Sequence, residues 1–341
     1  MPATKIAFLG FGHVGQALAA LLMRKRTELK ERYGITFSAV GIATAKHGKI
    51  INPAGLDLSG AVQLVRSGNS LNLMTHTLTL DAADYIRKCG ADVLFENTPV
   101  NHENGQPAVD HLRLALECGM HAITANKGPV VFAYRELMEL ARSQGKRFLF
   151  ESTVMDGAPI FSLFRRALPG AQLLSLRGIL NSTTNLMLTR MEAGASFEAA
   201  VKNAQGAGLA ETDPSADIDG WDAAIKVAAL VSVLMEAPMT PAQVERTGIR
   251  DITPEMIRAA KGEGKRWKLV CSAERRGGEV RARVAPELVP LSSPLFNVGG
   301  ASSIVEFKTD VLASLSIVEG NPGPETTAYG LLADFIEAMN A

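Results

Sequence analysis

Short apolar segments alternate with longer amphipathic stretches over residues 1–150. Apolar and β-branched residues dominate segments 5–9 and 37–42, for example, and residues typical of turns follow each of them. Alternation of this kind is typical of βαβ units, in which helices connect parallel strands. The pattern therefore predicts an α/β domain with a doubly wound parallel sheet at residues 1–150.

The order of expected elements changes after residue 150. Helices and strands then follow one another without regular alternation, which predicts a second, mixed α+β domain at residues 151–320. Asn321, Pro322, Gly323 and Pro324 interrupt the chain. A last helix follows this break, and we expect residues 321–341 to return to the first domain.

The individual elements follow from apolar periodicity and from turn residues. The expected strands are residues 5–9, 37–42, 92–96, 121–124, 148–150, 174–180, 267–274, 280–284, 304–308 and 313–318. The expected helices are residues 14–33, 160–168, 185–192, 221–235 and 327–339, with a hairpin turn at residues 275–278.

Composition restricts the classes of molecule that the protein is expected to bind. The 35 Lys and Arg residues balance 35 Asp and Glu residues, so no net field recruits nucleic acid or an anionic membrane. Mean hydropathy is +0.10, and no apolar run reaches the roughly 18 residues of a membrane span. No secretion signal is recognisable, and the three cysteines are too scattered for a disulfide framework. We expect a cytoplasmic protein that acts on a small molecule.

A glycine-rich loop directly follows the first expected strand and opens the long helix. It consists of Gly10, Phe11, Gly12, His13, Val14 and Gly15. In a GxGxxG loop the first glycine permits a tight turn, the second lets the backbone approach a pyrophosphate, and the third lets helix and strand pack closely. The alternative is a glycine-rich turn without a ligand, but the strand before it and the helix after it favour a Rossmann-type dinucleotide site.

Cofactor choice depends on the end of the second strand, where a carboxylate would select NAD by binding the ribose 2′-hydroxyl. This segment contains Thr44 and Lys46 but no carboxylate. Lys46 is suited to a 2′-phosphate, so we expect NADP to be preferred to NAD. An ordinary surface lysine is the alternative interpretation of Lys46.

Two further loops should face the cofactor, because ligands of open α/β sheets bind beyond the carboxyl ends of the strands. One loop contains Asn97 and Thr98, and the other contains Lys127. We expect Asn97 and Thr98 to bind the ribose or carboxamide and Lys127 to reach the reacting atoms. The alternatives are that Asn97 and Thr98 only form a turn and that Lys127 is a solvated loop lysine.

Five carboxylates precede one lysine near the middle of the chain: Glu211, Asp213, Asp217, Asp219, Asp222 and then Lys226. Helix capping by Asp219 would explain part of this cluster. Asp222 and Lys226 are four residues apart, a spacing that also suits a surface ion pair. Residues 227–235 are almost entirely apolar, however, so the helix is expected to be buried and Lys226 to need Asp222 as its partner.

This cluster fits the reduction of a carbonyl group. The carbonyl oxygen needs a proton while hydride reaches its carbon, and a positioned lysine supplies one. Lys226 and Lys127 are the two candidates. An amino-acid substrate also needs an acceptor for its ammonium group, a task that suits Glu211 or Asp222.

Several of these segments together resemble the homoserine dehydrogenase family. They are residues 10–15, Thr124 to Lys127, Gly178 to Asn185, and Glu211 to Lys226, in which Asp217-x-x-Gly220-x-Asp222-Ala223-x-x-Lys226 is the most specific element. The resemblance implies interconversion of L-aspartate 4-semialdehyde and L-homoserine with NAD(P)H, a step toward threonine and methionine. It implies catalytic roles for Lys226 and Lys127. It also implies substrate contacts from Glu211, Asp222, Asp217 and Thr183.

The resemblance further implies a monovalent cation such as sodium, held partly by backbone carbonyls. The matching residues are Glu151, Val154, Asp156 and Ala158, and Asp156 stands where a small residue is expected. Ser182 likewise replaces an expected glycine, while Gly323 fits a cofactor-facing position. The second domain is then a substrate-binding and dimerisation domain, and a homodimer is expected. Neither a regulatory domain nor a preceding kinase segment is expected.

Two other functions remain compatible with the sequence. One is a related dehydrogenase of another small amino acid or semialdehyde, for which the departures at Asp156 and Ser182 leave room. The other is a non-catalytic nucleotide-binding sensor, which would bind NADPH without oxidising it.

Overall fold

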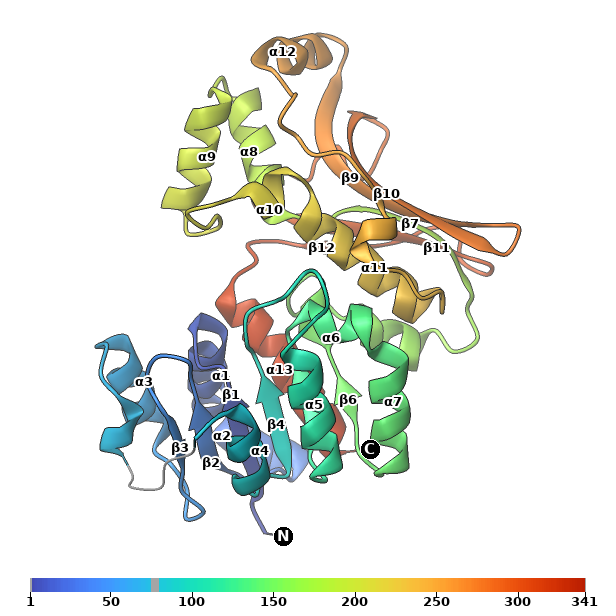
Figure 1. Ribbon diagram of the computed structural model, residues 1–341. Helices are drawn as coiled ribbons and strands as arrows, with labels where there is room; N and C mark the ends of the chain where they lie inside the picture. The colour runs from blue at the N-terminus through green and yellow to red at the C-terminus, as the bar shows by residue number, and fades with distance from the viewer. Residues whose placement is uncertain (1, 75–79, 341) are drawn as a thin grey trace. The chain divides into compact units, whose positions relative to one another are not determined.

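The computed structural model describes residues 2–74 and 80–340. The chain divides into two compact units, Met1–Pro159 with Gly323–Ala341, and Ile160–Pro322. The first unit therefore runs past residue 150, and its second segment begins at Gly323. Both units can be followed by colour along the chain in Figure 1.

The described strands of the first unit form one sheet in the order β3-β2-β1-β4-β5-β6. The strands are β1 (Thr4–Leu9), β2 (Phe37–Ala43), β3 (Lys49–Ile51), β4 (Val93–Glu96), β5 (His121–Thr124) and β6 (Phe148–Leu149). Neighbouring strands are parallel, except that β3 pairs with β2 in the antiparallel sense. The predicted α/β class with a Rossmann-type doubly wound sheet is confirmed.

Helices cover both faces of this sheet (Figure 1). They are α1 (His13–Arg24), α2 (Arg26–Tyr33), α3 (Leu58–Arg66), α4 (Ala82–Lys88), α5 (Ala108–Glu117), α6 (Lys127–Phe132), α7 (Tyr134–Ser143) and α13 (Pro324–Met339). Side chains of one strand alternate between two cores, because successive residues point to opposite faces. Phe8 of β1 belongs to the core under α1, α3 and α13, and Leu9 to the core under α4 and α5.

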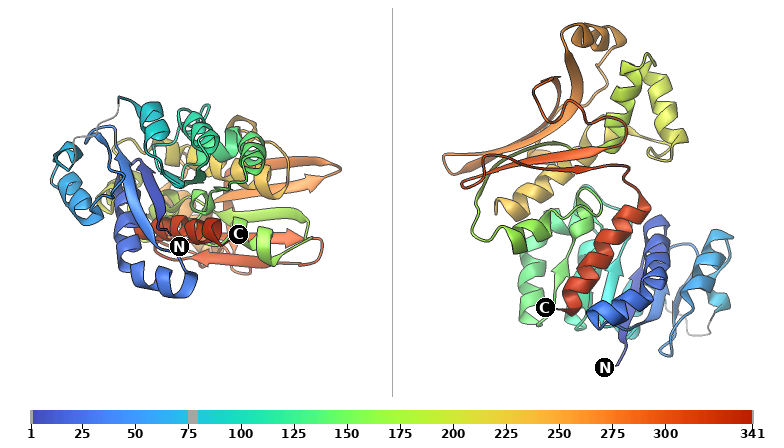
Figure 2. Two further views of the ribbon diagram at one scale, coloured as in Figure 1. Left: turned by 90° about the horizontal axis from the view of Figure 1, so that it is seen from below. Right: turned by 180° about the vertical axis from the view of Figure 1, so that it is seen from behind.

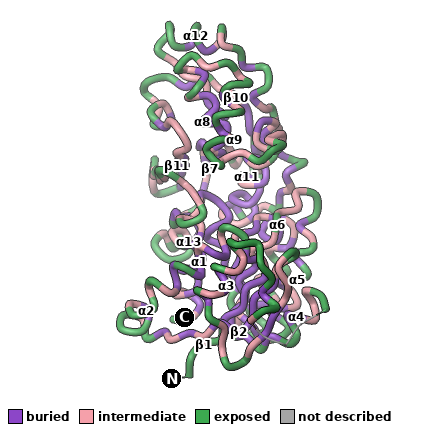
Figure 3. Tube along the Cα trace, turned by 90° about the vertical axis from the view of Figure 1, so that its left-hand side faces the viewer, coloured by how far each residue is buried: buried purple, intermediate pink, exposed green. Residues whose placement is uncertain are grey.

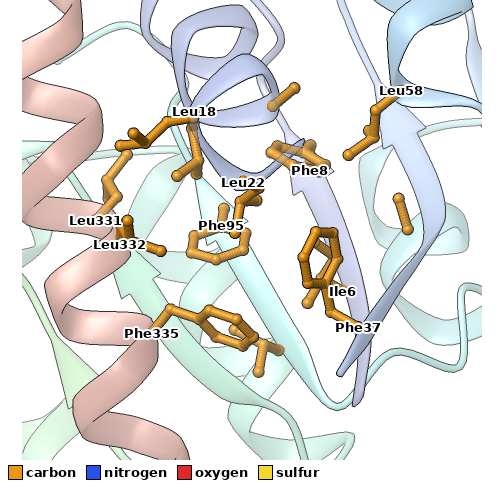
Figure 4. Close-up of a cluster of buried hydrophobic side chains, with 14 of the residues drawn as sticks. Ile6, Phe8, Leu18, Leu22, Phe37, Leu58, Phe95, Leu331, Leu332 and Phe335 are labelled. Carbon is orange, nitrogen blue, oxygen red and sulfur yellow. The ribbon is translucent and has the colours of Figure 1, made fainter. Parts of the chain in front are cut away.

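The last helix completes the first of these cores. Figure 2 shows α13 (red) beside α1 (blue) from behind, and the two helices are in extensive contact. In Figure 4 the side chains of Leu331 and Phe335 point toward Leu18 and Phe95. The rings of Phe335 and Phe95 are 5.8 Å apart between centroids in an edge-to-face arrangement, which aromatic pairs prefer. Residues from both ends of the chain thus build one core.

The single long helix predicted at residues 14–33 is wrong. The chain forms two helices, α1 and α2, which are separated at Lys25. Apolar residues line one face of α1, whereas Leu29 is the buried residue of the polar α2. The two helices are separated at Lys25, which has φ −93° and ψ 5°, and α2 ends at Gly34 in the left-handed conformation.

The described strands of the second unit form a mainly antiparallel sheet in the order β12-β11-β7-β9-β10-β8. The strands are β7 (Leu173–Ile179), β8 (Glu245–Arg246), β9 (Lys265–Arg276), β10 (Glu279–Pro290), β11 (Ser303–Thr309) and β12 (Leu315–Glu319). Gly277 and Gly278 connect β9 to β10 with φ values of 56° and 94°. Two consecutive positive φ angles are typical of a two-residue hairpin turn, which glycine adopts without strain.

Five helices lie in the described part of this unit: α8 (Ser182–Glu192), α9 (Phe197–Gly206), α10 (Ser215–Ile218), α11 (Trp221–Leu234) and α12 (Pro254–Gly262). Most of α11 is buried, and it packs on β9 and β10 (Figure 3). The helix predicted at residues 160–168 is present but shorter and irregular: residues 161–162 are α-helical and the helix continues as a π-helix at Leu163–Ala167. Short 3₁₀ turns occupy Leu71–Leu73 and Glu151–Thr153 in the first unit and Pro241–Gln243 in the second. No described helix combines the length and apolar character needed to cross a membrane.

Candidate active site

The glycine loop of the first unit uses each of its glycines for a different reason. Gly10 has φ +93°, and a Cβ at this position would lie 2.4 Å from the carbonyl oxygen of Asn97. A Cβ at Gly15 would lie 2.7 Å from the oxygen of Gly10, so only glycine lets α1 pack this closely. A Cβ at Gly12 would have no atom within 4 Å. The backbone at Gly12 is therefore open to a ligand.

The first turn of α1 offers backbone donors at the same place. Gly12 is the N-cap residue, and no side chain caps the helix. The first N–H groups of an α-helix lack intrahelical acceptors, and the helix dipole places partial positive charge there. The loop and the helix terminus together form a phosphate-binding arrangement.

A cavity of about 1470 Å³ lies beside this loop. It exceeds the roughly 300–1,000 Å³ of most small-molecule pockets, so an extended dinucleotide fits. Among the residues predicted to bind the cofactor, those that line the cavity are Gly10, Phe11, Gly12, His13, Thr44, Lys46, Asn97 and Thr98. Val14 and Gly15 pack inside the unit, Lys127 begins α6, and Gly323 precedes α13; none of these four belongs to the described wall.

Two polar side chains in this wall have buried atoms without a hydrogen-bond partner. Both the oxygen and the nitrogen of the Asn97 amide are in this condition, as is Nδ1 of His111 on α5. Burial lowers the pKa of His111, which favours the neutral imidazole. Buried polar groups without partners are rare in folded proteins because they lose their hydration. A polar ligand in the cavity would supply the missing partners, so the residues present fit a dinucleotide.

Basic residues line the cavity from the end of α1, the segment after β2, the start of β3 and the end of α3. They are Arg24, Lys46, His47, Lys49 and Arg66. Thr44 shapes the turn that carries two of them, because its hydroxyl accepts a 2.6 Å hydrogen bond from the backbone of His47. Glu325 is the one carboxylate among the described lining residues. This region is therefore suited to a phosphate.

The turn expected to hold a cation contains two successive residues in the left-handed conformation, Met155 with φ 55° and Asp156 with φ 46°. The Asp156 carboxylate accepts hydrogen bonds from the backbone of Gly323 and the hydroxyl of Thr326, both 2.8 Å long. Asp156 thus fixes the start of α13, which accounts for an acid at this position.

The predicted ion pair is present in the second unit. Nζ of Lys226 lies 2.9 Å from Oδ2 of Asp222 and donates a 2.7 Å hydrogen bond to the carbonyl of Leu180. The side chains of Lys226 and Asp222 are 16% and 17% exposed. The pair is therefore largely withdrawn from water, which excludes the surface interpretation and fixes the ammonium group in one place.

Asn181 connects this pair to a second carboxylate. Its amide donates 2.6 Å and 3.0 Å hydrogen bonds to Asp217 and Asp222. Its oxygen accepts a 2.8 Å bond from the backbone of Thr184, so Asn181 also caps α8. Burial, followed by the charge of Asp222, raises the pKa of Asp217. The sequence gives Asn181 no role of its own, although it lies within a segment that resembles the family.

The segment that carries Glu211 is anchored on both sides. The Thr183 hydroxyl donates to the carbonyl of Leu209 over 3.0 Å. The Gln205 amide donates to the carbonyls of Glu211 and Thr212 over 3.2 Å and 3.1 Å. Glu211 is exposed. The backbone is thus held while the carboxylate remains accessible.

The suggested capping role of Asp219 is wrong. Gly220, in the left-handed conformation at φ 80°, is the N-cap of α11, and no side chain caps that helix. Asp219 instead ends α10, and its carboxylate pairs with Arg250. The short helix α10 was not predicted. It makes Asp219 its C-cap residue, so Asp219 is not the N-cap of α11.

Lys268 of β9 is a buried cation that the sequence analysis missed. It is fully buried, and its Nζ donates to Oδ1 of Asn185 over 3.0 Å and to the carbonyl of Val298 over 2.7 Å. Burial lowers the pKa of Lys268 to about 8. Its position beside buried Leu269 in a predicted strand is a weak signal, because strand lysines are usually exposed.

The first unit is thus a dinucleotide-binding domain, and the second holds a positioned lysine with neighbouring carboxylates. These features define a nicotinamide-dependent oxidoreductase. Residues 10–151 match the family profile "Homoserine dehydrogenase, NAD binding domain", and residues 159–336 match the profile "Homoserine dehydrogenase". The chain belongs to the homoserine dehydrogenase family, as predicted, and interconverts L-aspartate 4-semialdehyde and L-homoserine with a nicotinamide cofactor.

Individual proteins are similar over nearly the whole chain. A homoserine dehydrogenase of Methanocaldococcus jannaschii is 38% identical, covering 98% of both chains. An NAD(+)-dependent homoserine dehydrogenase of Pseudomonas canavaninivorans is 36% identical, covering 97% of this chain and 95% of that one. Among solved structures, a putative homoserine dehydrogenase from Archaeoglobus fulgidus has a TM-score of 0.86 at 34% identity, covering 98% of each chain. A hyperthermophilic archaeal homoserine dehydrogenase in complex with NADPH has a TM-score of 0.84 at 28% identity, covering 99% of this chain and 98% of that one.

Replacement of Gly10 by alanine tests the close approach of the glycine loop. Gly10→Ala places a Cβ against the backbone of Asn97, so we expect NADPH binding, measured by fluorescence titration, to weaken at least roughly tenfold. Gly34→Ala is the matched control, because Gly34 also has positive φ but no atom within 4 Å of its Cβ position. The control should lose about 1 kcal/mol of stability and keep its affinity. Equal affinity in both variants would contradict the steric argument.

Proposed function

We propose that this chain reduces the semialdehyde with NADPH in preference to NADH, and that Lys226 supplies the proton to the carbonyl oxygen. The single observation that carries the role of Lys226 is its buried pairing with Asp222, which Asn181 extends to Asp217. A lysine held in this way keeps a fixed ammonium group in a partly dry environment. Such preorganisation is what proton transfer in a transition state requires.

The bound nicotinamide supplies the hydride. Lys226 donates a proton to the oxygen of the aldehyde as its carbon is reduced, and it takes that proton back when homoserine is oxidised. Asp222 and the carbonyl of Leu180 orient the ammonium group throughout. Positioned acid–base groups of this kind contribute roughly 10²- to 10⁴-fold to the rate.

The amino-acid part of the substrate needs an acceptor for its ammonium group. Glu211 is assigned that role because its backbone is anchored while its carboxylate is exposed. Asp222 is already engaged by Lys226 and Asn181, and it orients the proton donor. Thr183 contributes by holding the carbonyl of Leu209. Asp217 completes the polar surface of the substrate site.

The cofactor is assigned to the cavity of the first unit, with its pyrophosphate at Gly12 and the start of α1. The unpartnered amide of Asn97 is suited to the nicotinamide end, together with Thr98. Lys127 is the first residue of α6, and Asn126 caps that helix by accepting a 2.9 Å hydrogen bond from Gly128. Asn126 also donates to the carbonyl of Thr98, so Lys127 is proposed as a second catalytic lysine next to the cofactor.

The preference for NADP rests on charge. The cavity wall that contains Lys46 also contains Arg24 and Arg66, and the end of β2 lacks the carboxylate that binds a ribose 2′-hydroxyl. A 2′-phosphate would gain charge-assisted hydrogen bonds here, whereas NADH offers no negative charge at the ribose 2′ position to pair with these cations.

A homodimer formed by the second unit is also proposed. Leu291 and Val311 are each 70% exposed, and Val318 on the edge strand β12 is 62% exposed. Apolar edge strands of this kind are usually covered. Light scattering should give the mass of two chains for the wild type and of one chain for Val318→Lys. Two chains in the variant would place the interface elsewhere.

Two further expectations, one from the resemblance and one from composition, are retained as proposals. The monovalent cation is assigned to the turn that contains Glu151, Val154, Asp156 and Ala158, with backbone carbonyls as its main ligands because Asp156 already binds α13. A reducing, cytoplasmic location is supported by Cys89, Cys118 and Cys271, none of which is paired.

Replacement of Lys226 tests the proton donor. In Lys226→Ala, kcat for NADPH oxidation with aspartate semialdehyde should fall by roughly 10² to 10⁴ while NADPH affinity stays unchanged. Lys202→Ala, which removes an exposed lysine from α9 of the same unit, is the control and should keep its kcat. A Lys226 variant that retained most of its turnover would exclude the assignment. Wild-type turnover with another semialdehyde alone would favour the related dehydrogenase, and NADPH binding without any turnover would favour the sensor.

Replacement of Lys46 tests cofactor preference. Lys46→Glu should lower the ratio of kcat/KM for NADPH to that for NADH by roughly 10- to 100-fold, because one hydrogen bond between charged groups becomes a repulsion. Lys30→Glu on α2 makes the same change of charge at an exposed position outside the cavity wall, and its ratio should stay constant. If both variants behave alike, the preference has another origin.

A further inference from the structure

A buried carboxyl group lies at the carboxyl end of β4, and no step proposed so far uses it. Glu96 is fully buried and is the last residue of that strand. Its Oε1 accepts hydrogen bonds from the backbone N–H of Thr98, at 3.0 Å, and from the Thr98 hydroxyl. Its Oε2 lies 2.9 Å from the hydroxyl of Thr124 on β5. Glu96 therefore joins the loop after β4 to the end of β5.

The hydrogen bonds around Thr124 determine which form of the carboxyl fits. Oγ1 of Thr124 also lies 2.9 Å from the carbonyl oxygen of Glu96 and accepts a 2.9 Å bond from the backbone of Asn126. A hydroxyl donates one proton and accepts two. If Glu96 is ionised, the single hydroxyl proton of Thr124 goes either to Oε2 or to the carbonyl oxygen of Glu96. The other of these two contacts then has no proton between its oxygen atoms. A neutral Glu96 donates to Thr124, which then donates to the Glu96 carbonyl, so every contact is satisfied.

We propose that Glu96 is a positioning residue that acts as a neutral carboxylic acid, donating to Thr124 and thereby fixing the two loops that carry Asn97 and Lys127. Asn126 extends this network, because its amide donates to the carbonyl of Thr98 over 3.0 Å and accepts from Gly128. The loop with the unpartnered amide of Asn97 and the start of α6 are thus held by one chain of hydrogen bonds.

The consequence concerns cofactor binding and rests on the cofactor site proposed above. Asn97 and Thr98 line the dinucleotide cavity, and Thr98 bonds directly to Glu96. Loss of the Glu96 proton leaves a charge in a buried site and removes the donor to Thr124. The two loops must then rearrange, so NADPH affinity depends on the protonation of Glu96.

The pH at which Glu96 loses its proton follows from the surroundings of its carboxyl group. Burial raises the pKa of Glu96 to about 7, although hydrogen bonds from Thr98 and Thr124 lower it. The pKa of Glu96 is higher in the folded protein than in the unfolded chain. The neutral carboxyl therefore holds the two loops fully at low pH, and this effect is lost as the pH rises through about 7. The ionisable side chains on elements around β4 are Lys5 on β1, His121 on β5, His13 and Arg24 on α1, Asp110, His111, Arg113 and Glu117 on α5, Lys127 on α6, and Glu325, Tyr329, Asp334 and Glu337 on α13, whose Phe335 packs against Phe95.

NADPH titration by fluorescence, without substrate, tests the proposal from about pH 6 to about pH 8.5. In the wild type, Kd should rise several-fold over this range. Glu96→Gln keeps one acceptor and one donor in the same places, so it should match the wild-type Kd at low pH and vary less with pH. Glu96→Ala should weaken binding roughly tenfold at low pH. Glu103→Gln, which neutralises an exposed glutamate on the following loop, should titrate like the wild type.

The comparison with Glu96→Gln removes other causes of pH dependence, because the 2′-phosphate and every other ionisable side chain are the same in both proteins. Equal pH dependence in the wild type and Glu96→Gln would overturn the proposal, as would weak binding by Glu96→Gln at low pH. If Glu96→Ala does not fold, infrared difference spectra decide: a carboxylic-acid C=O band present in the wild type at low pH and absent from Glu96→Gln is expected, and its absence from both contradicts a neutral Glu96. Failure of the proposed NADP preference would instead appear in the Lys46 variant.

Discussion

The close approach of two backbones at Gly10 and Asn97 is the constraint on which the cofactor domain depends. β1 lies at the centre of the parallel sheet, between β2 and β4, and the chain leaves β1 and β4 at the same edge. The N–H of Asn97 donates to the carbonyl of Leu9 over 2.7 Å, which holds the two loops together. Only glycine at position 10 leaves room for this contact. The cavity therefore opens where the strand order changes direction, as in other doubly wound sheets.

The second unit solves a different problem, which is to keep a charged lysine in a largely apolar helix. Burial of an unpaired ammonium group costs several kcal/mol. Asp222, Asn181 and the carbonyl of Leu180 satisfy Lys226. The apolar part of α11 packs on β9 and β10 and makes this position rigid. Stability and chemistry thus depend on the same few hydrogen bonds, so removal of one partner affects both.

The fold class and most of the strands were predictable because they follow from local pattern, whereas α3 to α7, α9, α10 and α12 were not among the expected helices. The glycine loop, the apolar strands and the apolar end of α11 each carry a signal within a short segment, and the resemblance supplied the family. The break at Lys25 was not predictable, because no glycine or proline marks it in the sequence. The role of Asn181 depends on two carboxylates 36 and 41 residues away. Glu96 looks like any acid at a strand end until Thr124 is placed beside it.

The position of α13 has a consequence for synthesis on the ribosome. Leu331 and Phe335 fill the core between α1 and the sheet, and Asp156 fixes the start of the same helix. A nascent chain that ends at residue 159 therefore exposes an apolar groove along α1, although every strand of the sheet has already been made. The cofactor domain closes this groove only after residues 324–339 have left the exit tunnel. During the interval in which the second unit is translated, the apolar side chains that α13 later covers stay exposed, and such surface makes a partly folded chain prone to aggregation.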